Sequence, residues 1–129
     1  MLSSSRVEAN IPAGDLTRAR ELYADKLGLT PVRDVMGVNL VYETSGGTRF
    51  NLYETAYAGQ AGHTIAQFHV DDIDAEVHDL QAKGVDFEVY EDMPGVRWDG
   101  VIASLEGIGR AAWFRDSEDN ILCVDQPEA

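Results

Sequence analysis

Two side chains of this sequence, Glu8 and His69, could move a proton near neutral pH. An unperturbed imidazole titrates in that range, and a buried carboxylate can have a raised pKa and act as a base. Each residue also has a plainer interpretation. A histidine at a strand end can simply hydrogen-bond to backbone. A carboxylate such as Glu8 can be partly solvated or paired with Arg49, Arg110 or Arg115.

The remaining histidines and the one cysteine predict less chemistry. His63, His69 and His78 are spaced in a way that fits no usual metal motif. Cys123 excludes an internal disulfide framework and fits a reducing compartment. A small buried apolar role is favoured over a nucleophile, because no histidine is placed by local sequence to activate the thiol. The acidic residues at 71–76 lack EF-hand spacing and are typical of a helix N-terminus.

Composition limits the class of partner. The formal charge is −13, from 23 acidic and 10 basic residues, so the chain would repel a nucleic acid backbone. This charge fits either a solubility surface or attraction of a cationic ligand, and charge alone does not separate the two. The sequence contains no apolar run long enough to cross a bilayer and no apolar signal segment. We therefore expect a soluble cytoplasmic protein without membrane contact.

The elements that must position these groups occur twice, with an offset of about 57 residues from Asp15 to Asp72. In each copy a β-like run leads into a helix, at 15–27 and at 72–83. Apolar residues recur along each helix at three- and four-residue spacing. Asp15 is a natural N-cap, and a glycine, Gly28 or Gly84, suits each helix end.

Strand-like runs follow each helix, and two pairs of them form corresponding hairpins. The predicted strands of the first copy after its helix include 38–43 and 50–54, and those of the second are 87–91, 101–105, 111–115 and 121–125. Residues 92–100, which include Trp98, are predicted as an irregular loop, and 56–62 as the linker. The sequence thus predicts a single α+β domain, 1–129, made of two βαβββ repeats, about 1–58 and 63–129. The repeats would form one open, curved, eight-stranded sheet with helices on its outer face and a cavity at the seam.

This double pattern resembles the vicinal oxygen chelate superfamily, which includes glyoxalase I, extradiol dioxygenases, fosfomycin-resistance proteins and bleomycin-binding proteins. The matching residues are Gly14-Asp15-Leu16, Tyr23, Leu27-Gly28-Leu29, Val70-Asp71-Asp72-Ile73-Asp74, Lys83-Gly84-Val85, Ala112-Trp113-Phe114-Arg115-Asp116 and Asn120-Ile121-Leu122. The chain also resembles a metal-poor subgroup with a Met-Pro-Gly loop before the last strands. The resemblance covers nearly the whole chain.

In metal-dependent members of this superfamily, four ligands come from the first and last strand of each copy. The resemblance carries these positions onto Glu8, Asn51, Ile65 and Cys123. Ile65 has no lone pair and Cys123 is soft, so the set does not make the usual divalent site. We therefore expect no metal and no cofactor. A strand slip of one residue would swap the inward set and reopen this possibility.

Strand alternation extends the inward face from these positions. The opposite faces, which include Val7, Ala9 and Ile11, are apolar and suit packing beneath the helices. Trp98 is predicted either to cover the cavity mouth or to anchor its loop to the sheet. Trp113 is expected in the core or in a dimer interface. The candidate ligand-binding residues are Glu8, Asn10, Asn51, Tyr53, Gln67, His69, Trp98 and Cys123, with Asp125 on the same face as Cys123.

Three functions fit these features, and the sequence leaves open whether the protein is an enzyme. The first is a small-molecule binder that sequesters a drug or metabolite. The second is a metal-independent isomerase, epimerase or lyase that uses Glu8 or His69. The third is a structural or regulatory module whose cavity has been lost or filled. A metal-dependent glyoxalase or dioxygenase would follow if the strand register were different. The resemblance also implies a homodimer.

Overall fold

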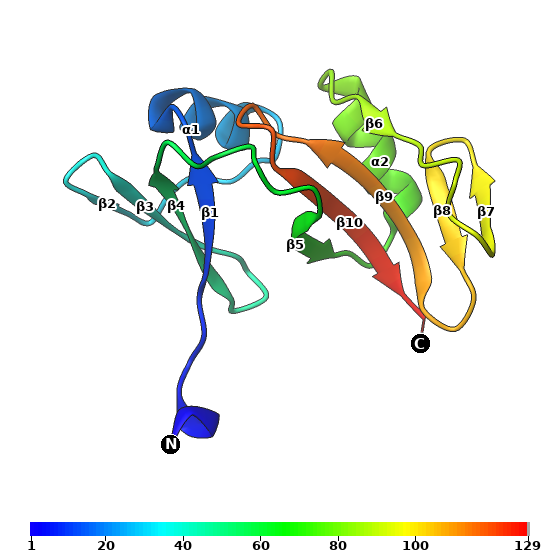
Figure 1. Cartoon of the computed structure of the whole chain (residues 1–129), viewed down its shortest axis with the longest axis horizontal. Coiled ribbons are helices and arrows are strands. Elements are labelled where there is room, and N and C mark those ends of the chain that lie inside the picture. Colours follow the sequence, from blue (N-terminus) through cyan, green and yellow to red (C-terminus); the bar gives the residue numbers. More distant parts are fainter. Residues whose placement is uncertain (129) are drawn as a thin grey trace.

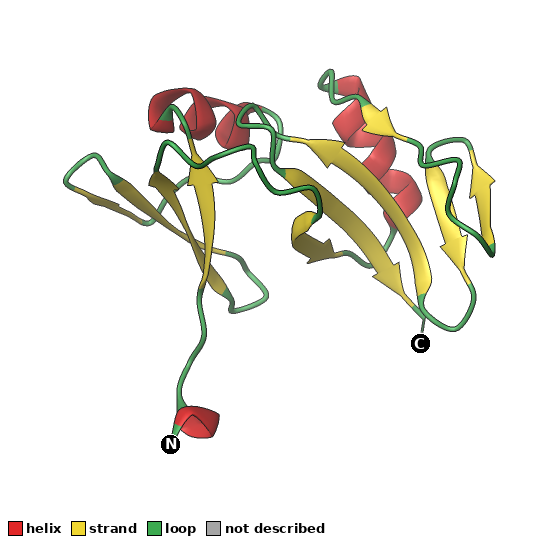
Figure 2. Cartoon of the chain, in the orientation of Figure 1, coloured by secondary structure: helices red, strands yellow, loops and turns green. Residues whose placement is uncertain are grey.

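The computed structural model describes residues 1–128 of the chain and contains two α-helices and ten strands (Figures 1 and 2). A short 3-10 turn, η1 (Leu2–Ser4), precedes them. The elements up to residue 63 are β1 (Ala9–Ala13), α1 (Leu16–Asp25), β2 (Arg33–Val35), β3 (Asn39–Glu43) and β4 (Arg49–Glu54). Those after it are β5 (Thr64–His69), α2 (Ile73–Ala82), β6 (Phe87–Glu88), β7 (Val96–Asp99), β8 (Ile102–Leu105), β9 (Gly109–Arg115) and β10 (Ile121–Pro127).

The strands form two separate open sheets. The first sheet has the order β1-β4-β3-β2, and the second has the order β5-β10-β9-β8-β7, with β6 paired to the far end of β9. In each sheet the first strand runs parallel to the last strand of its half, and the other pairs are antiparallel. Figure 1 shows α1 beside the first sheet and α2 behind the second. The α+β class is confirmed, but the single eight-stranded sheet was wrong, because β1 and β5 are each an outer strand of a different sheet.

The structure has ten strands, whereas the predicted sheet had eight. One of the additional strands lies in the segment expected to be a loop. Residues 96–99 form β7, which pairs with β8 and places Trp98 opposite Ala103. Pro94 and Gly95, just before this segment, are typical of a turn. The strand that follows them has only four residues, so the sequence pattern did not indicate it. The prediction of a strand over 87–91 was too long, since β6 covers only Phe87–Glu88.

Both helices begin as the sequence predicts. The side chain of Asp15 accepts a hydrogen bond from the Arg18 amide at 3.0 Å, and that of Asp72 accepts one from the Ala75 amide at 3.1 Å. Such caps satisfy amides that the first helical turn leaves without partners.

At each helix start, a further backbone amide donates a hydrogen bond to a side chain of the last strand of the same half. The Leu16 amide donates to Oε1 of Glu54 at 3.3 Å, at the end of β4. The Ile73 amide donates to Oε1 of Gln126 at 3.0 Å, near the end of β10. The two halves therefore share a cap, a strand order and a tie between helix and last strand.

The core lies between the sheets and the helices. Tyr23 of α1 is fully buried and packs its ring 5.8 Å from Tyr42, which stacks on Phe50 at 4.9 Å. In the second half, Phe87 and Phe114 pack edge to face at 5.5 Å. The buried strand positions expected beneath the helices, Ile11, Leu122 and Val124, are confirmed. Val7 and Ala9 are instead exposed: β1 begins two residues later than predicted, so Val7 precedes the strand and Ala9 is its exposed first residue.

The hairpin loop at 116–120 crosses from the second half into the first. Oδ2 of Asp116 accepts from the Tyr23 hydroxyl at 2.7 Å, and its Oδ1 accepts from the amides of Glu118 and Asn120 at 2.9 and 3.0 Å. Nδ2 of Asn120 donates to the Pro12 carbonyl at 2.8 Å. All three loop side chains are buried, so their polar atoms depend on these partners.

Glu118 completes this junction. Its carboxylate accepts from Nε of Arg18 at 2.8 Å and from the Asp15 amide at 2.8 Å. Burial raises the pKa of Glu118, but Arg18, the Asp15 amide and Ser117 outweigh it and hold the pKa at about 2. Burial, together with Asp116, raises the pKa of Tyr23 well above its usual value. The junction therefore contains an ionised carboxylate in a buried position.

No helix among residues 1–128 is both long and apolar enough to span a bilayer.

Candidate functional site

A cleft of about 820 Å³ lies at the seam between the two halves. We call it the seam cleft. Its walls come from β1, the β3–β4 hairpin, β5 and the segment after α1, with further contributions from α2, β9 and β10. The lining residues are Ala9, Ile11, Leu27, Leu29, Thr44, Ser45, Gly46, Thr48, Arg49, Phe50, Ile65, Ala66, Gln67, Phe68, His69, Val70, Glu76, Leu80, Phe114 and Val124.

The seam cleft has an apolar interior and a polar margin. Phe50 from the first half and Phe68 from the second meet edge to face, with ring centroids 6.2 Å apart. Strand β5 contributes two side chains to the polar margin, Gln67 and His69, and both are exposed. Pockets of this size, mostly apolar and with a few polar groups, are typical of sites that bind drug-sized molecules.

Four predicted or neighbouring residues share one face of the second sheet. The parallel pairing of β5 and β10 places Gln67 opposite Cys123 and His69 opposite Asp125. Nδ1 of His69 lies 2.8 Å from Oδ1 of Asp125. Of the predicted residues, Gln67 and His69 line the seam cleft.

Three of the other predicted residues lie on the first sheet, where Asn10 is paired with Asn51 and Tyr53 with Pro12. Oδ1 of Asn51 accepts a weak hydrogen bond from Nδ2 of Asn39 at 3.4 Å. These side chains do not line the seam cleft, so within one chain the structure does not bring the two predicted groups together.

Glu8 precedes β1 and is exposed, so in this chain it is not a buried carboxylate. Its oxygen Oε2 lies 3.8 Å from the Arg6 guanidinium, which was not among the partners considered. The three arginines that were considered pair elsewhere: Arg49 with Glu43, Arg110 with Asp74 and Arg115 with Glu88.

Cys123 is fully buried. Burial, together with the nearby carboxylate of Asp125, raises the pKa of its thiol to about 12. The thiol therefore stays protonated near neutral pH, which agrees with a packing role rather than a nucleophilic one.

Trp98 lies in β7, and its ring is 6.1 Å from that of Trp113, which in turn packs edge to face with Tyr90 at 5.7 Å. These rings form an aromatic group on the second sheet. Trp98 belongs to a strand and does not line the seam cleft, so the prediction of an irregular loop was wrong at this residue, and of its two predicted roles the structure favours the anchor.

The four positions that carry metal ligands in metal-dependent members do not fit a divalent ion. They combine exposed Glu8, neutral Asn51, apolar Ile65 and the protonated thiol of buried Cys123. Elsewhere among residues 1–128, no three side chains of His, Cys, Asp or Glu gather as a metal site would require.

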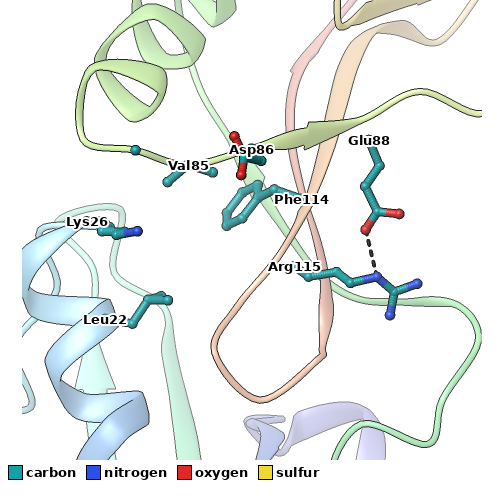
Figure 3. A pocket seen from close by; sticks show the side chains of 8 residues that line it. Leu22, Lys26, Val85, Asp86, Glu88, Phe114 and Arg115 are labelled. Carbon is teal, nitrogen blue, oxygen red and sulfur yellow. Dashed lines mark hydrogen bonds and ion pairs between the residues drawn. The ribbon is translucent and has the colours of Figure 1, made fainter.

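A smaller hollow of about 340 Å³ lies between α1 and β6 (Figure 3). Leu22 of α1 and Lys26, just after that helix, face Val85 and Phe114 across it, and Arg115 pairs with Glu88 at 2.7 Å at its side. Phe114 lines both hollows. The seam cleft is larger and is lined by two of the predicted residues, Gln67 and His69, so it is the better candidate site.

Sequence reasoning missed the aromatic lining of the seam cleft and the contact between His69 and Asp125. Phe50 and Phe68 were not among the candidate residues, although they meet at the seam. A parallel pairing of the first and last strand of the second half would have revealed the His69 contact, because it sets residues 69 and 125 side by side.

Several solved structures share this fold. The bleomycin resistance determinant encoded on the transposon Tn5 superposes with a TM-score of 0.72 at 15% identity, covering 98% of this chain and 100% of that one. A bleomycin-binding protein complexed with bleomycin gives 0.69 at 17% identity, covering 97% and 100%. The antibiotic binding protein TnmS3 from Streptomyces sp. CB03234 gives 0.67 at 22% identity, covering 99% and 100%. Comparison with curated proteins found no match.

A family model for the Glyoxalase/Bleomycin resistance protein/Dioxygenase superfamily matches residues 6–121. The chain therefore belongs to this superfamily. The match confirms the resemblance stated from the sequence. The solved structures share little sequence identity with the chain, so their similarity supports the fold alone.

Proposed function

We propose that the protein binds a small molecule in the seam cleft and thereby sequesters a drug or metabolite, without the divalent metal that some relatives use. The observation that carries this proposal is the volume of about 820 Å³ with an apolar interior and a polar margin. Burial of a ring system against Phe50 and Phe68 would supply binding free energy, and Gln67 and His69 would orient polar groups of the ligand.

Two structural neighbours support this class of ligand. One was solved with bleomycin bound, and another is an antibiotic binding protein. The charge of −13 favours a ligand that carries positive charge, because the field of the protein would concentrate cations near its surface.

We further propose a single domain of two repeats that works in the cytoplasm as a homodimer. Two features support the homodimer. The strands β1 and β5 are outer strands of their sheets, and an outer strand offers backbone groups to another chain. In addition, Asn10, Asn51 and Tyr53 lie on a sheet face outside the seam cleft, where a second copy could use them.

Binding is tested by calorimetry and thermal shift with bleomycin and a panel of planar cationic antibiotics. A ligand selective for the native state should raise the melting temperature. Ala66→Phe places a ring in the seam cleft and should weaken binding at least tenfold. Ala75→Phe makes the same change on the exposed side of α2, outside the cleft, and should leave binding unchanged. Equal affinity of the two variants would reject the seam cleft as the site.

A metal-independent isomerase, epimerase or lyase is a second candidate, favoured by the 2.8 Å contact between His69 and Asp125. A paired imidazole of this kind can act as a general base. Turnover of a carbonyl or hydroxy-acid substrate that disappears in His69→Ala but persists in His78→Ala would establish it, because His78 is exposed on α2. Binding without turnover would support sequestration instead.

A further inference from the structure

The smaller hollow between α1 and β6, which we call the α1–β6 hollow, is built from both halves of the chain. Leu22 and Lys26 come from the first half, and Val85, Asp86 and Phe114 come from the second (Figure 3). Phe114 and Val85 are 1% and 8% exposed, so they close its floor. Its volume of about 340 Å³ is near the lower end of the range for small-molecule sites, roughly 300 to 1,000 Å³. The hollow therefore suits a single small metabolite better than a drug-sized molecule.

The charged side chains of this hollow are balanced, in contrast to the charge of −13 on the whole chain. Nε of Arg115 and Oε1 of Glu88 lie 2.7 Å apart, so these two charges satisfy each other. Lys26 and Asp86 also line the hollow, but neither forms an ion pair or a side-chain hydrogen bond with another of residues 1–128. In this part of the chain, the hollow thus holds one cation and one carboxylate that lack a partner.

The ammonium group of Lys26 extends from the first half toward the second. Lys26 is the C-cap of α1 and is half-buried. Its Nζ lies beside Gly84, where an added Cβ would be 3.7 Å away. Gly84 follows α2, whose last carbonyls carry partial negative charge and favour a nearby cation. This helix end holds the ammonium in the hollow but gives it no ion partner, so an anionic group of a ligand would stabilise it.

We propose that the α1–β6 hollow binds a free α-amino acid with a small apolar side chain. The carboxylate of the amino acid would meet Lys26, its ammonium would meet Asp86, and its side chain would pack on Leu22. Because an α-amino acid carries opposite charges on neighbouring atoms, it can bridge two protein charges that do not reach each other. A ligand with one charge would leave either Lys26 or Asp86 unpaired. The hollow shares only Phe114 with the seam cleft, and the proposal does not depend on the function proposed there.

Three matched probes test the ligand class. They are leucine, isocaproate, which lacks the ammonium group of leucine, and isoamylamine, which lacks its carboxylate. Titration followed by nitrogen-15 NMR of the backbone amides gives both the affinity and the site. Leucine should shift the amides of Gly84, Val85 and Asp86. It should also bind about tenfold more tightly than either analogue, because each analogue lacks one charged contact.

Two substitutions separate the two charged contacts. Lys26→Met removes the positive charge and keeps the length of the side chain, so the preference for leucine over isoamylamine should fall to near one. Asp86→Asn should do the same for the preference over isocaproate. Lys83→Met and Asp79→Asn make the same changes in an exposed ion pair near the end of α2, outside the hollow. These two controls should leave both preferences unchanged.

The outcomes separate this inference from the proposed function. If leucine shifts no amide around the hollow, the site is rejected. If isocaproate or isoamylamine binds as tightly as leucine, the zwitterionic ligand class is rejected. If either preference persists in the variant meant to remove it, the assigned contact is rejected. Ala66→Phe, which places a ring in the seam cleft, should leave leucine binding unchanged, so each site can fail without the other.

Discussion

The two halves of the chain have the same scaffold but different chemistry. Each helix has an aspartate cap and donates an amide hydrogen bond to the last strand of its own half, where Glu54 or Gln126 accepts it. The paired faces differ: Asn10 and Asn51 oppose each other on the first sheet, whereas His69 and Asp125 do so on the second. The features that hold a repeat together are thus kept in both copies, while the groups able to exchange a proton lie in one.

The hairpin loops show the same contrast more sharply. The loop at 116–120 of the second half buries Asp116, Glu118 and Asn120 and bonds to the first half, whereas residues 45–48 of the corresponding loop of the first half are exposed. Within the loop at 44–48, the Thr44 and Thr48 hydroxyls hydrogen-bond to each other at 3.0 Å. Loops at equivalent places in the repeat therefore differ in what their loss should cost.

The largest expected effect is a loss of stability when a side chain of the buried loop, rather than of the exposed loop, is removed. Asp116→Ala would leave the Tyr23 hydroxyl and two amides without their acceptor, and should lower the free energy of unfolding by about 3 kcal/mol. Thr48→Ala in the exposed loop should change it by less than about 0.5 kcal/mol. Urea denaturation measures both. Similar losses for the two variants would remove the distinction.

A smaller effect, near 2 kcal/mol, is expected from the pH dependence of the Glu118 junction. The folded-state pKa of Glu118, about 2, is below its usual value of 4.5. Its contribution to stability is therefore fully present above the usual value and is lost as the pH falls from there toward 2. We expect on the order of 2 kcal/mol, since the partner Arg18 is more than half exposed and solvent screens the pair.

Unfolding measured across this acidic range checks the prediction. The stability curves of the wild-type protein and Glu118→Gln should converge at the acidic end and separate toward neutral pH. Glu43→Gln is the matched control, because Glu43 pairs with Arg49 on the exposed surface of the first half. A constant gap between the wild-type and Glu118→Gln curves would show that ionisation of Glu118 adds no stability.

The smallest expected effect tests the shared part of the scaffold. Asp15→Ala and Asp72→Ala should each lower the free energy of unfolding by about 1 kcal/mol, because each removes one helix cap. Chemical denaturation of the two single variants and the double variant measures the losses and their sum. A loss confined to one variant would mean that the two helix starts are not energetically equivalent.

Local signals were enough to predict the helices and the superfamily. Asp15 and Gly28 mark the first helix in the sequence itself, and the structure places α1 between them. The signals themselves, the Asp15 cap and the spacing of apolar residues such as Leu16 and Tyr23, lie within a few helical turns of each other. The sequence was therefore sufficient to predict the helix.

Features that depend on distant pairing were harder to predict. Strand β7 is only four residues long and forms by pairing with β8. The residues on either side of it are typical of turns. The separation into two sheets depends on which strands stay unpaired, and strand alternation does not carry that information.

The candidate site was predicted only in part, for a related reason. Alternation indicated that Gln67 and His69 share a face, and both line the seam cleft. It could not indicate that the apolar Phe50 and Phe68 from different halves meet there. Nor could it show that Asp116 and Glu118, which read as solvated loop residues, are buried against α1.

The self-contained helix caps have a practical consequence. If the backbone were cut between β4 and β5, each fragment would retain its own cap and the tie from its own last strand. Reassembly would rest on non-covalent contacts such as those of Glu118 with Arg18 and of Phe50 with Phe68. The protein is therefore a natural starting point for a split reporter, in which complementation of the two pieces could be tuned through a single buried carboxylate.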